Sequence, residues 1–390
     1  MRGANHLGCC RPCRDKRLFE AGRKHAILIS SRNTVRSTEV CNIINMQVYK
    51  LLLLLIGLSV AVLTGCMVHP VTLQSEFNIV SEERELNIGR QAHAEIIKQF
   101  GYYQNEELQR YVNEVGQKLA AVSKRRDITY RFAVLDTPME NAFAVPGGYI
   151  YITRGLLAYL NSEAELAGVL GHEIGHIVGR DSANQISQSM LAQVAVLAGV
   201  AAPGGADVAQ ATGMLLNSVM LGYGREKEYL ADQQGIEYMC RAGYDPEQMS
   251  SFQKNLSRIT QGPVGNQVYN STHPDMLNRI ERATAQAKVM LAMNNAMQQI
   301  NNGPPVVVQG LATKGQIASD RYKDYIDGLA YGPREDLRHI KIYTAQEGDT
   351  FMLIARKTFG TEQQAKLLAE INGMPVTMQL VNGYKVKTIY

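Results

Sequence analysis

The chain has 390 residues, with 40 Lys and Arg against 36 Asp and Glu, and a formal net charge of +4. The basic excess lies in residues 1–45, which hold nine Lys and Arg and three Asp and Glu. Without that segment and Lys50, the remainder carries a net charge of −3. A basic nucleic-acid-binding surface is therefore not expected, and no nucleic-acid partner is predicted.

Residues 46–65 have the pattern of a bacterial export signal. Lys50 precedes an apolar run of about a dozen residues, which is too short to cross a membrane and typical of a secretory leader. The run ends in Leu63-Thr64-Gly65-Cys66, which resembles a lipobox. In such signals the cysteine becomes the first mature residue and carries lipid, so Cys66 is predicted to anchor the chain to a membrane.

The position of this leader decides how its flanks are interpreted. Residues 1–45 do not belong ahead of an export signal and are interpreted as a non-native N-terminal extension, with the true start at Met46. Residues 66–80 are expected to form a lipid-anchored tether. Met67 follows the cysteine where some lipoproteins have aspartate, which favours the periplasmic face of the outer membrane over the inner membrane.

Residues 162–179 predict a buried helix. Ser162 and Glu165 make a capping box at its start, and apolar residues recur at helical spacing up to Gly179. Within the helix stands His172-Glu173-Ile174-Gly175-His176. Residues four apart lie on one helical face, so both imidazoles can bind one ion while the glutamate poises a water. The motif has only three fixed letters, so its context has to support it.

A second predicted helix supplies carboxylates. A catalytic zinc site needs a third protein ligand, and residues 180–188 contain no histidine. Glu228 and Asp232 are four residues apart, which places them on one helical face. Glu228 can complete the ligand set, and Asp232 can accept the free N–H of a ligand histidine. The alternative for Glu228 is one more charge on a solvated face, because charged residues adjoin it.

Four stretches together resemble the zinc metallopeptidase family that includes the CAAX prenyl endopeptidase and bacterial membrane-stress proteases. They are His172–His176, Glu228–Asp232, Asn141–Gly148 and Thr272-His273-Pro274, all within residues 81–290. The resemblance implies one zinc ion per chain, held by His172, His176 and Glu228. It also implies that Glu173 is the general base.

Two further roles suggested by this resemblance stay open. Gly147-Gly148 predict a turn, and Tyr149-Ile150-Tyr151 begin a strong strand former. This segment is expected to line the cleft and pair with extended substrate, unless it is an ordinary hairpin. His273 is expected either to donate to the oxyanion or to occupy the open zinc position at rest, unless it only caps a turn before Pro274.

Residues 190–220 are apolar but are interrupted by polar side chains and by Pro203-Gly204-Gly205. Each half is shorter than the roughly 20 residues that a membrane span needs. A buried helical hairpin is therefore predicted, which argues against an integral-membrane protease of the CAAX type.

The C-terminal part has a different composition. Residues 291–339 are polar and rich in helix breakers, and are interpreted as a linker. Residues 340–390 predict strand, helix, helix and strand, and Gly348-Asp349-Thr350 and Ile371-Asn372-Gly373 resemble LysM modules. That resemblance implies binding of N-acetylglucosamine polymers such as peptidoglycan, although Val381-Asn382-Gly383 departs from the usual pattern.

The predicted fold is therefore α+β: a mainly helical zincin-type metallopeptidase domain with a small sheet, followed by a small LysM-like β-α-α-β module. The predicted function is a zinc endopeptidase, anchored by lipid in the bacterial envelope, that cleaves misfolded or stalled envelope proteins. The alternative is a non-proteolytic, peptidoglycan-associated chaperone or scaffold with a structural zinc. The presence of Glu173 argues against that alternative.

Overall fold

The computed structural model describes residues 46–50, 52–53, 66–69, 71–197, 213, 222–259, 268–300 and 315–390. The chain divides into two compact units, 1–65 and 66–390, and the elements described here belong to the second. The expected extension 1–45, most of the leader and most of the hairpin 190–220 lie outside the described residues. Among the residues described, no helix combines the length and apolar character needed to cross a membrane.

The unit begins with a short antiparallel hairpin. Its strands are β1 (Cys66–Val68) and β2 (Ser75–Phe77). The hairpin contacts the rest of the unit through charged side chains, because Glu76 of β2 accepts from Nζ of Lys227 at 2.6 Å. The segment expected to be a tether is thus partly ordered against the domain.

A three-stranded sheet lies at the centre of the first domain. Its strands are β3 (Arg131–Leu135), β4 (Ala142–Val145) and β5 (Tyr149–Thr153), in the order β3-β5-β4. β5 runs parallel to β3 and antiparallel to β4. Helices cover both faces, so β5 is buried along its whole length. The helices α3 (Glu106–Ala120) and α5 (Glu163–Gly179) share a core with one face, and α2 (Glu82–Phe100) and α6 (Asp181–Leu197) with the other.

The strand expected to bind substrate is the central one, and this corrects the sequence prediction. Because β5 pairs on both sides, Tyr149, Ile150 and Tyr151 have no free main-chain edge to offer a peptide. Gly147 and Gly148 form the predicted turn between β4 and β5, with φ values of 81° and 86° that favour glycine. The motif was located correctly, but the order of the strands places another one at the edge.

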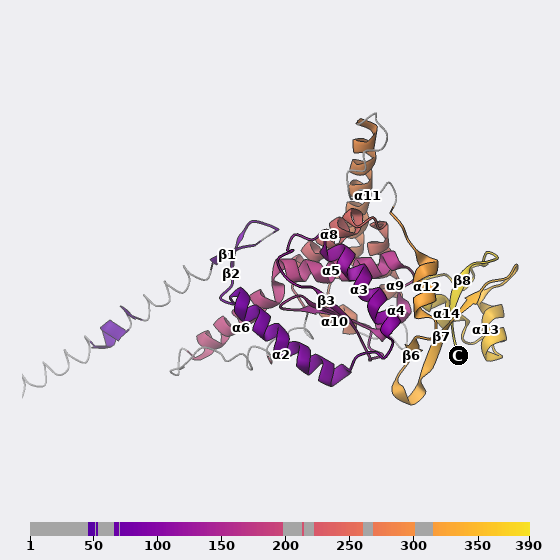
Figure 1. Ribbon diagram of the computed structural model, residues 1–390, viewed down its shortest axis with the longest axis horizontal. Coiled ribbons are helices and arrows are strands. Elements are labelled where there is room, and N and C mark those ends of the chain that lie inside the picture. The colour runs from indigo at the N-terminus through magenta and orange to yellow at the C-terminus, as the bar shows by residue number, and fades with distance from the viewer. Residues whose placement is uncertain are drawn as a thin grey trace, which may run out of the picture. The chain divides into compact units, whose positions relative to one another are not determined.

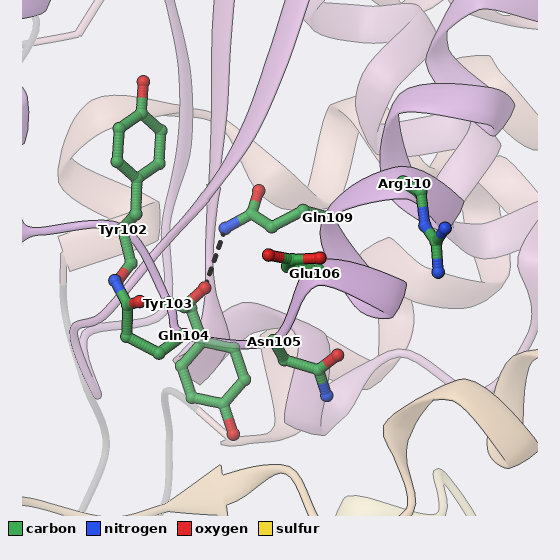
Figure 2. Close-up of a pocket in the computed structure, with 7 residues that line it drawn as sticks. All are labelled: Tyr102, Tyr103, Gln104, Asn105, Glu106, Gln109 and Arg110. Carbon is green, nitrogen blue, oxygen red and sulfur yellow. Dashed lines mark hydrogen bonds between the residues drawn. The ribbon is translucent and has the colours of Figure 1, made fainter.

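Of the two outer strands, β3 is closed to a further strand. The side-chain amide of Gln109 donates to the carbonyl of Val134 at 2.9 Å and accepts from its N–H at 2.8 Å. Figure 2 shows Gln109 beside a surface pocket, with its amide turned toward the carbonyl of Tyr103, 3.0 Å away. Among the described residues, no strand pairs with the outer edge of β4. β4 is therefore the edge that remains.

The helix predicted around His172 is α5, and its predicted ends are confirmed. Oγ of Ser162 accepts from the N–H of Glu165 at 3.1 Å, which caps the first turn. The carboxylate of Glu165 accepts from the N–H of Asn161 at 2.6 Å, in place of the N–H of Ser162 that a strict capping box would use. The helix ends at Gly179, and Arg180 follows in the left-handed region with a φ of 54°.

The second predicted helix is α8 (Arg225–Arg241), which lies along α5 (Figure 1). Small residues allow the two backbones to approach closely. A Cβ atom on Gly175 would lie 2.8 Å from Cα of Ala231, which is closer than two carbon atoms can pack. This approach brings Glu228 to the face of α5 that carries the histidines.

Three helices complete the first domain. They are α9 (Glu247–Ile259), α10 (Val268–Thr272) and α11 (Met276–Ile300), and both α9 and α11 pack against α8. His273 lies in the turn between α10 and α11. Asp275 in the same turn has a φ of 67° and accepts from the hydroxyl of Tyr229 of α8, so the turn is tied to the helix that carries Glu228.

The C-terminal elements follow the predicted order. They are β7 (Arg338–Thr344), α13 (Phe351–Phe359), α14 (Ala365–Ile371) and β8 (Lys385–Ile389). The boundaries of the expected linker 291–339 need correction, because that segment holds the end of α11, α12 (Ser319–Ile326), β6 (Ala330–Tyr331) and a 3-10 turn (Arg334–Asp336). β6 joins β7 and β8 in one sheet.

The C-terminal module packs against the first domain through a buried lysine. Nζ of Lys387, on β8, donates to the carbonyls of Ala158 at 2.7 Å and Leu160 at 2.8 Å. These carbonyls lie at the end of α4 (Arg154–Tyr159), where a helix has no internal partners for them. The module thus satisfies main-chain groups of the domain that precedes it.

Candidate metal centre and active site

Four buried side chains from three parts of the chain meet in one cluster. They are His172 and His176 of α5, Glu228 of α8 and His273. Each offers one ligand atom, and these atoms all lie within 4.8 Å of one another. The Nε2 atoms of His172 and His176 are 3.1 Å apart, and Nδ1 of His273 lies 3.2 Å from Oε2 of Glu228. The structure therefore brings together the three predicted ligands and the histidine whose role was open.

Carboxylates orient the two helix histidines. Nδ1 of His172 donates to Oδ1 of Asp232, and Nδ1 of His176 donates to Oδ2 of Asp181, each at 2.8 Å. With the proton on Nδ1, each Nε2 presents a lone pair. Two lone pairs facing each other at 3.1 Å repel, and a cation between them removes the repulsion. Two imidazoles and a carboxylate form a donor set that fits zinc.

The charges around the cluster are strongly coupled. Burial lowers the pKa of His176, but the nearby carboxylates of Asp181 and Glu228 outweigh it and raise that pKa to about 10. Burial also opposes ionisation of Glu228, yet the Arg279 guanidinium holds the pKa of that carboxyl well below its usual range. The glutamate is thus ready to bind a cation, and a metal has to compete with protons for the histidine.

Glu173 brings to the cluster a carboxylate that lacks a hydrogen-bond partner among the described residues. It is 0% exposed, and neither of its oxygens has a hydrogen-bond partner among the described residues. Its Oε1 lies 3.8 Å from Nε2 of His273. A buried carboxylate without a partner is costly, so the position is explained best by a ligand that the site receives. A water molecule beside this carboxylate could be deprotonated by it.

Two charged residues at the centre were missed by the sequence analysis. Asp181 begins α6 directly after the left-handed Arg180, and the chain reversal there aims its carboxylate back at His176. Arg279 of α11 contacts Glu228 and Asp232 from a third helix. An acidic residue just beyond the predicted stop of α5 was a signal for Asp181. No spacing rule connects Arg279 with residues of α8.

A comparison with protein families finds a match over the part of the chain that contains this centre. The model of Peptidase family M48 matches residues 105–287, a range that contains every residue of the cluster. Residues 105–287 are therefore similar to peptidase family M48. Zinc is the metal of this peptidase family, and the cluster can hold a metal ion.

Proteins with similar sequences include a mitochondrial metalloendopeptidase and bacterial proteases. The mitochondrial metalloendopeptidase OMA1 of Schizosaccharomyces pombe is 30% identical over 221 residues, which are 55% of this chain and 64% of that protein. The β-barrel assembly-enhancing protease of Escherichia coli is 27% identical over 212 residues, 52% of this chain and 41% of that protein. A putative protein of that name from Vibrio cholerae is 32% identical over 160 residues, 38% and 33% of the two chains.

The matches cover only part of each relative, which limits the properties that can be compared with those of this chain. This chain spans between 33% and 64% of the length of the three relatives. Only this matched part can be compared between the chain and each relative. Substrates and partners of the relatives are properties of whole proteins, of which this chain matches only a part.

Proposed function

We propose that this chain is a zinc-dependent endopeptidase of the bacterial envelope that cleaves misfolded or stalled envelope proteins. The observation that carries the proposal is the buried carboxylate of Glu173, which has no hydrogen-bond partner among the described residues and lies beside a cluster that fits zinc. Relatives named β-barrel assembly-enhancing proteases support outer-membrane proteins as the substrate class. This function is favoured over a scaffold with a structural zinc, because a structural site needs no unpaired base.

In this proposal His172, His176 and Glu228 hold the zinc, and Asp232 and Asp181 orient the two imidazoles. When bound, zinc supplies Lewis acidity, which polarises a carbonyl and acidifies water. Glu173 accepts the proton of the attacking water and delivers it to the departing amine nitrogen of the substrate. Its burial excludes bulk water from that transfer.

An extended substrate is proposed to pair with the outer edge of β4. The N–H of Thr153 donates to the carbonyl of Asn141 at 3.0 Å, so the alternate residues Ala142 and Ala144 turn their main-chain groups away from β5. Main-chain pairing at this edge would hold a peptide with little demand on its sequence. That suits an enzyme whose substrates share only an unfolded state.

His273 is proposed to block the site at rest. Its Nε2 donates to the carbonyl of Ala142 at 3.1 Å, and its Nδ1 lies 3.2 Å from Oε2 of Glu228. The imidazole thus takes the fourth position of the cluster and one main-chain acceptor of the edge strand. A substrate strand would need both places. This geometry favours the resting-state role over the oxyanion donor.

The location of the enzyme is a separate proposal. Lipid on Cys66 is proposed to hold the M48 domain at the periplasmic face of the outer membrane, and residues 340–390 to contact peptidoglycan. A Cys66→Ala variant should still be exported but should appear in the soluble fraction of lysed cells. If the variant stayed in the membrane pellet, the anchor would have to be something other than this lipid.

The catalytic proposal is tested with Glu173→Gln. The amide keeps the shape of the side chain but cannot take a proton, so cleavage of an unfolded protein should fall below detection while zinc stays bound. Glu107→Gln, the same change at an exposed position of α3, should cleave normally. Zinc is measured by elemental analysis and cleavage by gel electrophoresis. Equal turnover by Glu173→Gln and the unmodified enzyme would favour the scaffold alternative.

A further inference from the structure

Arg279 is a fully buried arginine that faces the supports of the metal centre. It is 0% exposed and belongs to α11. Its Nη1 lies 2.7 Å from Oε2 of Glu228, while Nε and Nη2 donate to the two carboxylate oxygens of Asp232, each at 2.7 Å. One guanidinium therefore holds two carboxylates of α8 that lie one helical turn apart.

The contact with Glu228 leaves its two oxygens in different situations. Oε2 is held by the guanidinium, whereas Oε1 has no hydrogen-bond partner among the described residues and lies 3.4 Å from Nε2 of His176. We propose that Arg279 is a positioning residue that restrains Oε2 and thereby presents Oε1 of Glu228 to the metal. The inference rests on the proposed zinc site and adds a statement about how its carboxylate ligand binds.

The same guanidinium also contacts groups that position other members of the cluster. Asp232, which it grips at both oxygens, accepts from Nδ1 of His172 at 2.8 Å. Nη1 of Arg279 also donates to the main-chain carbonyl of His273 at 3.4 Å. Arg279 therefore acts on Glu228 directly, on His172 through Asp232 and on His273 through its backbone. His176 is the cluster member that it does not reach through these contacts.

The shape of the side chain matters as much as its charge. A guanidinium is a planar fork with five N–H donors, and it can bind one carboxylate with two parallel hydrogen bonds while a third donor holds another. A lysine ammonium would keep the positive charge but has no fixed fork. The Arg279→Lys variant therefore separates the positioning role from simple neutralisation of the two carboxylates.

The test compares the full-length Arg279→Lys and Arg279→Met variants with Arg154→Met. Arg154 is a matched control, because it is 1% exposed and binds Asp136 at 2.8 Å and two main-chain carbonyls outside the site. Affinity for Zn²⁺ is measured by competition with a chelator. The coordination of Co²⁺ in place of zinc is followed by its visible absorption spectrum, and kcat and KM are measured on an unfolded protein.

Arg279→Lys is expected to fold, to bind Zn²⁺ about 10- to 100-fold more weakly, and to change the Co²⁺ spectrum as both oxygens of Glu228 become free to bind. Its kcat should fall more than its KM rises. Arg154→Met should lose stability but keep the zinc affinity and the spectrum. The inference is overturned if Arg279→Lys matches the unmodified protein in both metal readouts, or if Arg154→Met weakens zinc binding as much.

These readouts separate the inference from the proposed function. Metal affinity and the Co²⁺ spectrum need no proteolysis, so a weakened, altered site in Arg279→Lys supports the inference even in a protein without cleavage activity. Loss of activity on Glu173→Gln, in contrast, reports only on the base. If Arg279→Met does not fold, the decision rests on Arg279→Lys, whose charge is retained.

Discussion

The two histidines of α5 lie one helical turn apart, yet different parts of the molecule support them. His172 is held by Asp232, which Arg279 grips with two hydrogen bonds, and all three residues are buried. His176 is held by Asp181, which lies 3.1 Å from Nζ of Lys227. That lysine also binds Glu76, and the side chains of this outer pair are 22% and 28% exposed.

This difference divides the centre into two halves. The interior half comprises His172, Glu228, Asp232, His273 and Arg279, and the surface half comprises His176, Asp181 and Lys227. The interior half is built from α8 and α11, where a low effective dielectric makes each unpaired charge costly. The surface half extends through Lys227 to β2, in the segment that follows the expected lipidation site. Water and salt reach its outer pair, so its interactions are weaker and easier to change. Substitutions in each half test whether the interior half contributes more to zinc affinity and to stability than the surface half does.

The largest effect is expected when a ligand is removed from either half. His172→Ala, His176→Ala and Glu228→Ala should each abolish stoichiometric zinc, because three protein ligands are what a catalytic zinc site provides. Elemental analysis of purified protein measures it, with Glu173→Gln as a variant that should keep one zinc per chain. Undiminished zinc in Glu228→Ala would remove this residue from the ligand set.

The second prediction compares the two carboxylates that orient the histidines. Asp232→Asn and Asp181→Asn should each weaken zinc binding by about 10- to 100-fold, since both hold a ligand ring. Only Asp232→Asn should also lower the free energy of unfolding by about 3 kcal/mol or more, because it breaks a buried pair with Arg279. Denaturant titration of the metal-free proteins checks this. Equal losses of stability would mean that the two halves are equivalent.

The sequence predicted the interior half better than the surface half, and the reason is geometric. Spacing rules apply within one helix, so the interval of four residues is enough to place Glu228 and Asp232 together on one face of α8. Asp181 depends on the left-handed turn at Arg180, which reverses the chain. Neither that reversal nor the position of α11, which carries Arg279, follows from periodicity.

The distinction between local patterns and contacts of distant segments also explains which features of the sheet and of the C-terminal module could be predicted from the sequence. The Gly147-Gly148 turn and the strand after it could be predicted, because turn and strand preferences are local. That β3 pairs in parallel on the far side of β5, and so moves the free edge to β4, depends on contacts between distant segments. The order from β7 to β8 was predicted for the same local reasons, whereas the burial of Lys387 against Ala158 and Leu160 was not.

The third prediction concerns His273, which belongs to the interior half. If it blocks the site at rest, His273→Ala should raise turnover several-fold, because the fourth position and the carbonyl of Ala142 become free for substrate. If it donates to the oxyanion instead, turnover should fall by about a hundredfold. Zinc content and unfolding are measured in parallel, since both should stay close to those of the unmodified protein. The sign of the change decides between the two roles.

The smallest effect is expected from Lys227→Met, which removes the outermost charge of the surface half. Lys227 is partly solvated, and an exposed ion pair contributes about 1 kcal/mol or less, so zinc affinity should fall by no more than about fivefold. The informative readout is the dependence of zinc affinity on salt concentration. Raising the ionic strength screens the contacts of Lys227 with Glu76 and Asp181 in the unmodified protein, so its zinc affinity should decline toward that of the variant, which itself changes little. Lys254→Met, at an exposed position of α9, should behave like the unmodified protein at every salt concentration. If the zinc affinity of Lys227→Met depended on salt as strongly as that of the unmodified protein, the salt-sensitive contacts of the surface half would have to involve residues other than Lys227.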